Sequence, residues 1–151
     1  MKKVRTLAIV VAGVCLVAGV AAHAASDAMK AIVGSYLEIQ TQLASDKTEG
    51  IKASATALAA RAEALGDAGA PMAKTAKAVA DAPDLKAARE AFGPLSDAVV
   101  AAAKAEGWKD LGDVKLAYCP MVKRSWLQKD EKINNPYYGT AMATCGEFKK
   151  P

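Results

Sequence analysis

The sequence predicts an all-α fold: an antiparallel up-down bundle of roughly four helices, with an irregular, aromatic-rich C-terminal segment packed on it. Three observations carry this prediction. Residues 25–106 are rich in Ala, Lys, Glu and Leu, which favour helix. Apolar residues in that region recur at alternating steps of three and four, the spacing of a left-handed bundle. From Gly107 onward the composition changes, and most of the aromatic residues lie there.

Four apolar stripes mark the predicted helices. The first comprises Met29, Ile32, Val33, Tyr36, Ile39 and Leu43, and the second Ile51, Ala55, Leu58, Ala62 and Leu65. A turn at residues 66–71 precedes a short third stripe of Met72, Ala76 and Val79, and the fourth comprises Leu85, Ala88, Phe92, Leu95 and Val99. These stripes predict helices that bury one face each.

Two local signals refine the helix boundaries. Asp46, with Glu49 three residues later, has the pattern of a capping box at the start of the second helix. Pro94 lies inside the fourth stripe, where its missing amide and its ring predict a kink.

The N-terminal residues have the pattern of a secretory signal. Lys2, Lys3 and Arg5 are followed by an apolar run, and Ala22-His23-Ala24 supplies small residues for cleavage after Ala24. We therefore expect residues 1–24 to be removed and residues 25–151 to form one periplasmic helical-bundle domain, with residues 107–151 as its motif-bearing C-terminal segment. No stable membrane insertion is expected after removal.

Removing the signal changes what the composition indicates. The formal net charge of +4 comes from 20 basic and 16 acidic residues, and three of the basic ones belong to the signal. Because the remainder is close to neutral and has no basic stripe with aromatics, we expect no nucleic-acid partner. The one histidine, His23, also leaves, so no histidine-dependent catalytic constellation remains. We expect a protein that is not an enzyme.

Sulfur is concentrated in the C-terminal segment. Met121 follows Cys119 by two positions, and Met142 precedes Cys145 by three. An extended strand would place the first pair on one side, and a helical turn would place the second pair on one face. If the two segments meet, two thiolates and two thioethers converge, a donor set that suits Cu(I). Cys119, Met121, Met142 and Cys145 are therefore candidate metal ligands.

The same cysteines have a structural interpretation. An even pair in an exported protein is typical of one disulfide, and a Cys119–Cys145 bridge would contribute about 3–4 kcal/mol for a loop of this length. A methionine near a cysteine is also common in packing. The two interpretations are compatible, since a reduced pair can bind a metal that an oxidised pair cannot.

The C-terminal motifs resemble a family of uncharacterised bacterial exported domains. The resemblance rests on Tyr118-Cys119-Pro120-Met121, Trp126-Leu127, Asn135-Pro136-Tyr137-Tyr138-Gly139, Met142 and Cys145-Gly146, with an upstream Phe92-Gly93-Pro94-Leu95-Ser96. Such domains are associated with, or fused to, the periplasmic adaptors of copper and silver efflux pumps. The stretch between Met121 and Trp126 is shorter here than the loop typical of that family. The resemblance implies a helical domain connected with heavy-metal handling.

Two functional hypotheses follow. The first is a periplasmic copper-homeostasis protein that binds Cu(I) through the four sulfur residues and buffers it or passes it to a heavy-metal efflux adaptor. The second is a disulfide-stapled helical interaction module of the cell envelope without a metal of its own. In that case Trp126, Tyr137 and Tyr138 would provide the partner surface.

Overall fold

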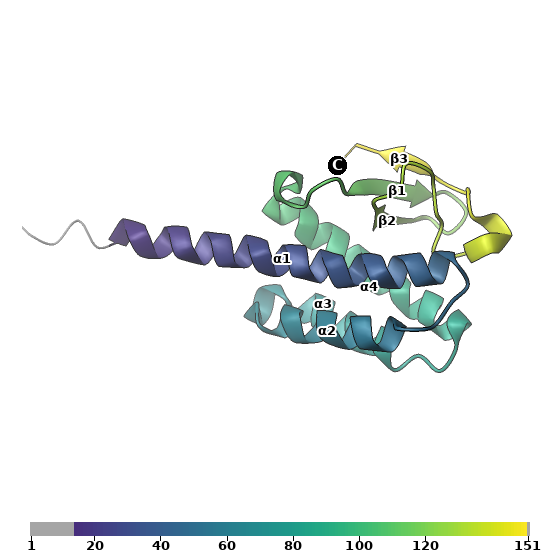
Figure 1. The fold of residues 1–151 in the computed structure, drawn as a ribbon, viewed down its shortest axis with the longest axis horizontal. Helices are drawn as coiled ribbons and strands as arrows, with labels where there is room; N and C mark the ends of the chain where they lie inside the picture. Colours follow the sequence, from purple (N-terminus) through teal and green to yellow (C-terminus); the bar gives the residue numbers. More distant parts are fainter. Residues whose placement is uncertain (1–13, 151) are drawn as a thin grey trace, which may run out of the picture.

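The computed structural model describes residues 14–150 and shows four helices followed by a small sheet (Figure 1). The helices are α1 (Val14–Ala44), α2 (Ile51–Glu63), α3 (Ala70–Ala80) and α4 (Leu85–Glu106). The basic start of the predicted signal lies outside the described residues, and the predicted cleavage position falls within α1. Within residues 14–150 no helix is long and apolar enough to cross a bilayer.

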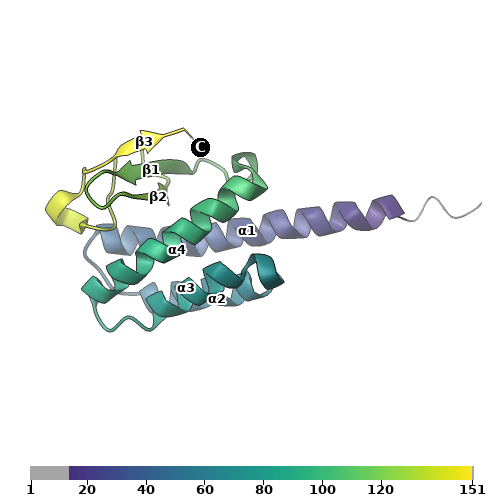
Figure 2. The same ribbon diagram turned by 180° about the vertical axis from the view of Figure 1, so that it is seen from behind.

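The helices form two layers, and the sheet forms a third. Figures 1 and 2 show α2 and α3 on one side of the α1–α4 pair and the sheet on the other, while the first part of α1 extends beyond the other elements. The predicted apolar stripes form the core: each residue of the first stripe is at most 3% exposed, and Phe92, Leu95 and Val99 of α4 are fully buried. The predicted helical bundle is thus confirmed.

The C-terminal segment is not irregular, which corrects the all-α prediction. It contains β1 (Lys115–Cys119), β2 (Arg124–Gln128) and β3 (Glu147–Lys149), which form an antiparallel sheet in the order β2-β1-β3. Two short 3₁₀ helices, η2 (Trp108–Asp110) and η3 (Gly139–Met142), lie in the same segment, and a third, η1 (Gly66–Ala68), lies between α2 and α3. Each strand is only three to five residues long, so the alternation that would have indicated a strand was too short to recognise.

Three predictions about the helices have different outcomes. The capping box was wrong, because Gly50 caps α2 in a left-handed conformation (φ 79°) without a side-chain hydrogen bond, and Asp46 has other partners. The third helix is confirmed. Pro94 lies inside α4, which is one helix from Leu85 to Glu106, and the fully buried Phe92 and Leu95 hold the residues on either side of it against the core.

The backbone polar groups on the outer edge of β2 form hydrogen bonds with side chains of α1 and α4 and with Tyr137. The Tyr36 hydroxyl accepts a hydrogen bond from the Leu127 amide at 3.2 Å and lies 2.6 Å from the Ser96 hydroxyl. Ser96 in turn donates to the carbonyl oxygen of Ser125 at 2.9 Å, and Tyr137 donates to the same oxygen at 2.8 Å. Because Ser125 and Leu127 are two positions apart, these groups point away from β1, and the sheet edge is buried with its polar atoms paired.

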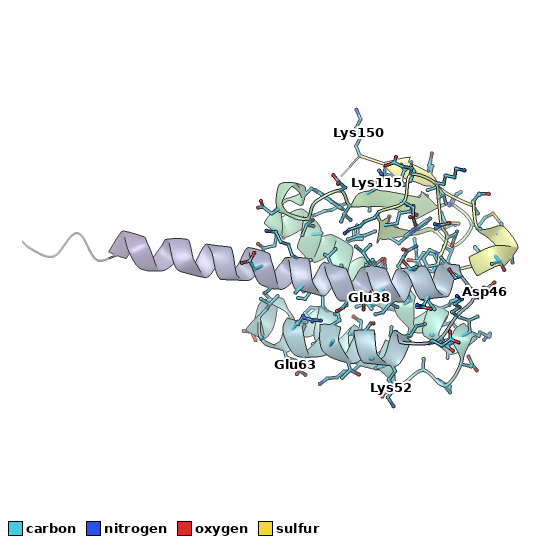
Figure 3. The ribbon with its side chains drawn as sticks, in the orientation of Figure 1. Glu38, Asp46, Lys52, Glu63, Lys115 and Lys150 are labelled. Atoms are coloured by element: carbon cyan, nitrogen blue, oxygen red, sulfur yellow. The ribbon has the colours of Figure 1, made fainter. Side chains whose placement is uncertain are left out.

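A second set of polar contacts joins the end of the bundle to η3. Arg89 of α4 donates to the carbonyl oxygens of Leu43 at 2.7 Å and Pro136 at 3.1 Å, and it pairs with the Asp46 carboxylate. Asp46 also accepts hydrogen bonds from the amide and hydroxyl of Thr140. Figure 3 shows Asp46 at the end of α1, beside η3. These contacts connect the end of the first helix with residues 136–140.

Removing the Tyr36 hydroxyl should destabilise the protein. Tyr36→Phe leaves the buried Leu127 amide without an acceptor and removes one of the two hydrogen bonds of the Ser96 hydroxyl, so the free energy of unfolding should fall by about 1–3 kcal/mol in urea denaturation. Tyr138→Phe is the matched control, because no hydrogen bond among the described residues uses its hydroxyl. Equal stability of the two variants would contradict the role assigned to Tyr36.

The contribution of Asp46 should depend on pH. Hydrogen bonds from Thr140 and Arg89 lower the pKa of Asp46 from 3.8 to about 2. Since the folded pKa lies below the unfolded one, the stabilisation is complete above pH 3.8 and is lost as the pH falls towards 2. In urea denaturation Asp46→Asn should be less stable than the parent at pH 7, and the difference should shrink below pH 4. The exposed Asp67→Asn should show no such pattern.

Candidate functional site

Strand β1 and the turn after it place Cys119. Cys119 is the last residue of β1 and is fully buried. The chain reverses over residues 120–123, where Lys123 adopts a left-handed conformation (φ 55°), and β2 begins with Arg124 opposite Cys119. Met121 therefore lies in the turn and not in an extended strand, and its side chain is 64% exposed. The expectation that Cys119 and Met121 share one side of a strand was wrong for this reason.

The segment from η3 to β3 places Cys145 next to Cys119. The Cys145 amide donates to the Met142 carbonyl oxygen at 3.0 Å, a three-residue turn like the one predicted for this pair. Strand β3 then pairs with β1, with Ala117 opposite Phe148 and Tyr118 opposite Glu147. One further step of this register puts Cys119 beside Gly146. As a result the two sulfur atoms lie 3.2 Å apart, with both cysteines as free thiols.

Asn135 holds the two cysteine segments together. Its side-chain amide donates to the Cys145 carbonyl oxygen at 2.7 Å and also contacts the Cys119 thiol. Its side-chain oxygen accepts from the amides of Tyr137 at 2.8 Å and Tyr138 at 3.3 Å. An Asn-Pro pair favours a turn, and an asparagine at the start of a turn often accepts from the amide two residues on. That local preference could have suggested the hydrogen bond from the Tyr137 amide to Asn135, but not the contacts of Asn135 with Cys145 and Cys119.

The two thiols have opposite acidities. Burial raises the pKa of Cys119, but hydrogen bonds from four donors outweigh it, so the pKa lies below its ordinary value. The donors are the Val122 amide, the Cys145 thiol, the Met121 amide and the Asn135 side chain. The pKa of Cys145 is raised, first by its hydrogen bond to Cys119, then by burial and by the Cys119 charge. Cys119 is therefore the more acidic thiol of the pair, and Cys145 is the less acidic one.

The structure brings the two thiols together and leaves the two thioethers at the surface. Met142 is 38% exposed, and together with Met121 and Phe148 it makes up the large exposed hydrophobic residues of the described chain. All three lie in the C-terminal segment. Among residues 14–150 no group of three or more His, Cys, Asp or Glu side chains is arranged to hold a metal ion. A metal at this site would therefore depend on sulfur alone.

The aromatic residues predicted as a partner surface have other roles. Trp126 is fully buried, donates to the Gln128 side chain at 2.9 Å and meets Tyr137 edge to face, so it belongs to the core and not to a contact surface. Tyr137 and Tyr138 are partly buried. Burial raises the pKa of Tyr137, which therefore stays a neutral hydrogen-bond donor to Ser125. Of the three, only the partly buried Tyr137 and Tyr138 have surface available to a partner.

The fold defines a mostly helical domain, a four-helix bundle with a small antiparallel sheet against one face. The chain belongs to the family described as "Protein of unknown function (DUF3347)", whose model matches residues 32–110. The match runs from within α1 to η2 and so ends before Cys119. Searches of curated proteins and of solved structures found no match.

The acidity difference can be measured without access to the buried thiol. In a Cys15→Ser background, Cys145→Ser leaves only Cys119, and Cys119→Ser leaves only Cys145. Ultraviolet thiolate absorbance should rise at a lower pH in the first variant, because the amides of Met121 and Val122 still stabilise the Cys119 thiolate. The reverse order would contradict the assignment.

Proposed function

We propose that this protein is a periplasmic soft-metal homeostasis protein that binds Cu(I) at the Cys119–Cys145 pair. The observation that carries the proposal is the 3.2 Å separation of the two sulfur atoms, contributed by segments 26 positions apart. The role is one of binding, not of catalysis. The bound ion would be buffered or handed to a heavy-metal efflux adaptor.

The acidity of Cys119 supports metal binding. A thiol must lose its proton before it can bind a metal, and the pKa of Cys119 is already lowered. A soft cation would take the place of the proton shared between Cys119 and Cys145. Since metal–thiolate bonds are about 2.3 Å long, the sulfur atoms must move apart to accept it. Cys145 is the partly exposed member of the pair and is the one with room to move.

The exposed thioethers suit the entry and exit of an ion. Met121 lies two residues after Cys119, and Met142 accepts the Cys145 amide through its carbonyl oxygen. Thioethers bind Cu(I) without losing a proton, so their contribution to the ligand set does not depend on pH. We assign them the weaker, outer part of the ligand set, with the thiols as the inner part.

The second candidate is a disulfide-stapled interaction module, and the same distance favours it. One S–S bond between Cys119 and Cys145 would fix β1 to the segment before β3, about 3–4 kcal/mol of stabilisation for a loop of this length. The exposed Met121, Met142 and Phe148 would then serve a partner protein and not an ion.

Anaerobic Cu(I) titration against a competing chelator separates the two candidates. In a Cys15→Ser background, the reduced protein should bind one Cu(I), and the oxidised protein should bind none. Cys119→Ser and Cys145→Ser should each weaken binding by more than about 100-fold, because each removes a thiolate ligand. Absence of binding in the reduced protein would reject the metal site and leave the staple.

The methionine ligands are tested by matched substitutions. Met121→Leu combined with Met142→Leu should weaken Cu(I) binding by about 10-fold, or about 1.4 kcal/mol, less than either cysteine change. Met72→Leu, at a core position that is 2% exposed, is the control for the chemistry of the substitution and should leave Cu(I) affinity unchanged. Unchanged binding in the double variant would restrict the site to the two thiols.

A further inference from the structure

A cleft of about 320 Å³ lies beside the turn that follows Cys119. Its walls come from three separate parts of the chain: Arg89 and Gly93 of α4, Val122 and Arg124 at the β1–β2 turn, and the side chains of Tyr137 and Tyr138. Its volume is in the range of small-molecule sites. None of the sulfur side chains lines it, so it is distinct from the proposed metal site.

Two arginines line this cleft from different elements. Arg89 is held by the Leu43 and Pro136 carbonyl oxygens and by Asp46, and its side chain is 18% exposed. Its Nη1 group takes part in none of the hydrogen bonds among the described residues. Arg124 lies across α4 at Gly93, where an added Cβ would come within 2.9 Å of its Nε atom. The missing side chain at Gly93 thus makes room for the second guanidinium.

Arg124 can exchange its ion-pair partner, Asp97, for another carboxylate. Its partner Asp97 has a side chain that is 57% exposed, and that of Arg124 is 35% exposed. Solvent-exposed ion pairs of this kind contribute little to the free energy of folding. A carboxylate inside the cleft can therefore compete with Asp97 for the Arg124 guanidinium. Glu90 also borders the cleft, but it pairs with Lys86 in solvent at 2.7 Å.

The remaining lining is mostly apolar. It comes from Tyr137, Tyr138 and Val122, and the Tyr137 ring also packs on Phe92 and Trp126. Planar guanidinium groups bind carboxylates through paired N–H donors, and aromatic walls favour a flat apolar body. From this combination we propose that the cleft is a binding site for a small aromatic carboxylate, whose charged group lies at Arg124 and Arg89 and whose ring lies between Val122 and the tyrosines.

This inference does not rest on the proposed copper site. The two sites do share Val122, whose side chain lines the cleft while its amide donates to the Cys119 sulfur. The Val122 amide is therefore a natural reporter for occupancy of the cleft, and Gly93 supplies a second reporter on the opposite wall.

Benzoate is the probe, and the amide resonances of Val122 and Gly93 in the full chain are the readout. Titration should shift both resonances with saturation. Benzamide, which has the same ring without the charge, should bind at least about 10-fold more weakly. Equal binding of the two compounds, or no shift with benzoate, would overturn the proposal.

Two substitutions with opposite expected effects test whether Arg124 binds the carboxylate. Arg124→Gln should weaken benzoate binding by about 10-fold, because it removes the charged donor. Asp97→Asn should strengthen binding, because it frees Arg124 from its competitor; since Asp97 is largely exposed, this variant should fold normally. Arg61→Gln, on α2, is the matched control and should not change the affinity. No strengthening in Asp97→Asn would contradict the role of Arg124.

Discussion

The structure depends on how the helices cover the outer edge of β2. A sheet edge buried against a bundle exposes amide and carbonyl groups to an apolar environment, and unpaired groups there are costly. Two helix side chains remove this cost: Tyr36 of α1 accepts from the Leu127 amide, and Ser96 of α4 donates to the Ser125 carbonyl oxygen. Because burial raises the pKa of Tyr36 well above its usual value, its hydroxyl stays neutral and the bridge is independent of pH in the physiological range.

The sulfur pair is a consequence of this docking. Once β2 is held on the helices, β1 pairs with β2, and β3 pairs with β1. That order brings the residue before Gly146 next to the end of β1, and Asn135 then bonds to both cysteine segments. The reactive atoms are thus positioned by a rigid sheet and one buried amide. The Arg89–Asp46–Thr140 contacts hold the η3 segment in place at the same end of the molecule.

The helical part of the fold could be predicted because its signals are local. The stripes from Met29 to Leu43 and from Leu85 to Val99 repeat at helical spacing over several turns, and the described structure buries nearly all of these residues. The strands could not be predicted in the same way. Strand β3 has three exposed residues and no apolar alternation, so only its pairing with β1 makes it a strand. Asp46 was misassigned because a capping signal competes with long-range partners that the sequence does not reveal.

The sequence by itself determined the bundle and named the residues with distinctive chemistry, Cys119, Met121, Met142 and Cys145, because residue type and short-range spacing are written in the chain. Only the tertiary structure decided which of them meet. It placed the two thiols in contact, left both methionines in solvent and moved Trp126 from the expected surface into the core. The physical reason is that the register of β1 with β3 joins segments more than 20 residues apart, and register depends on packing against the helices, a property of the whole fold.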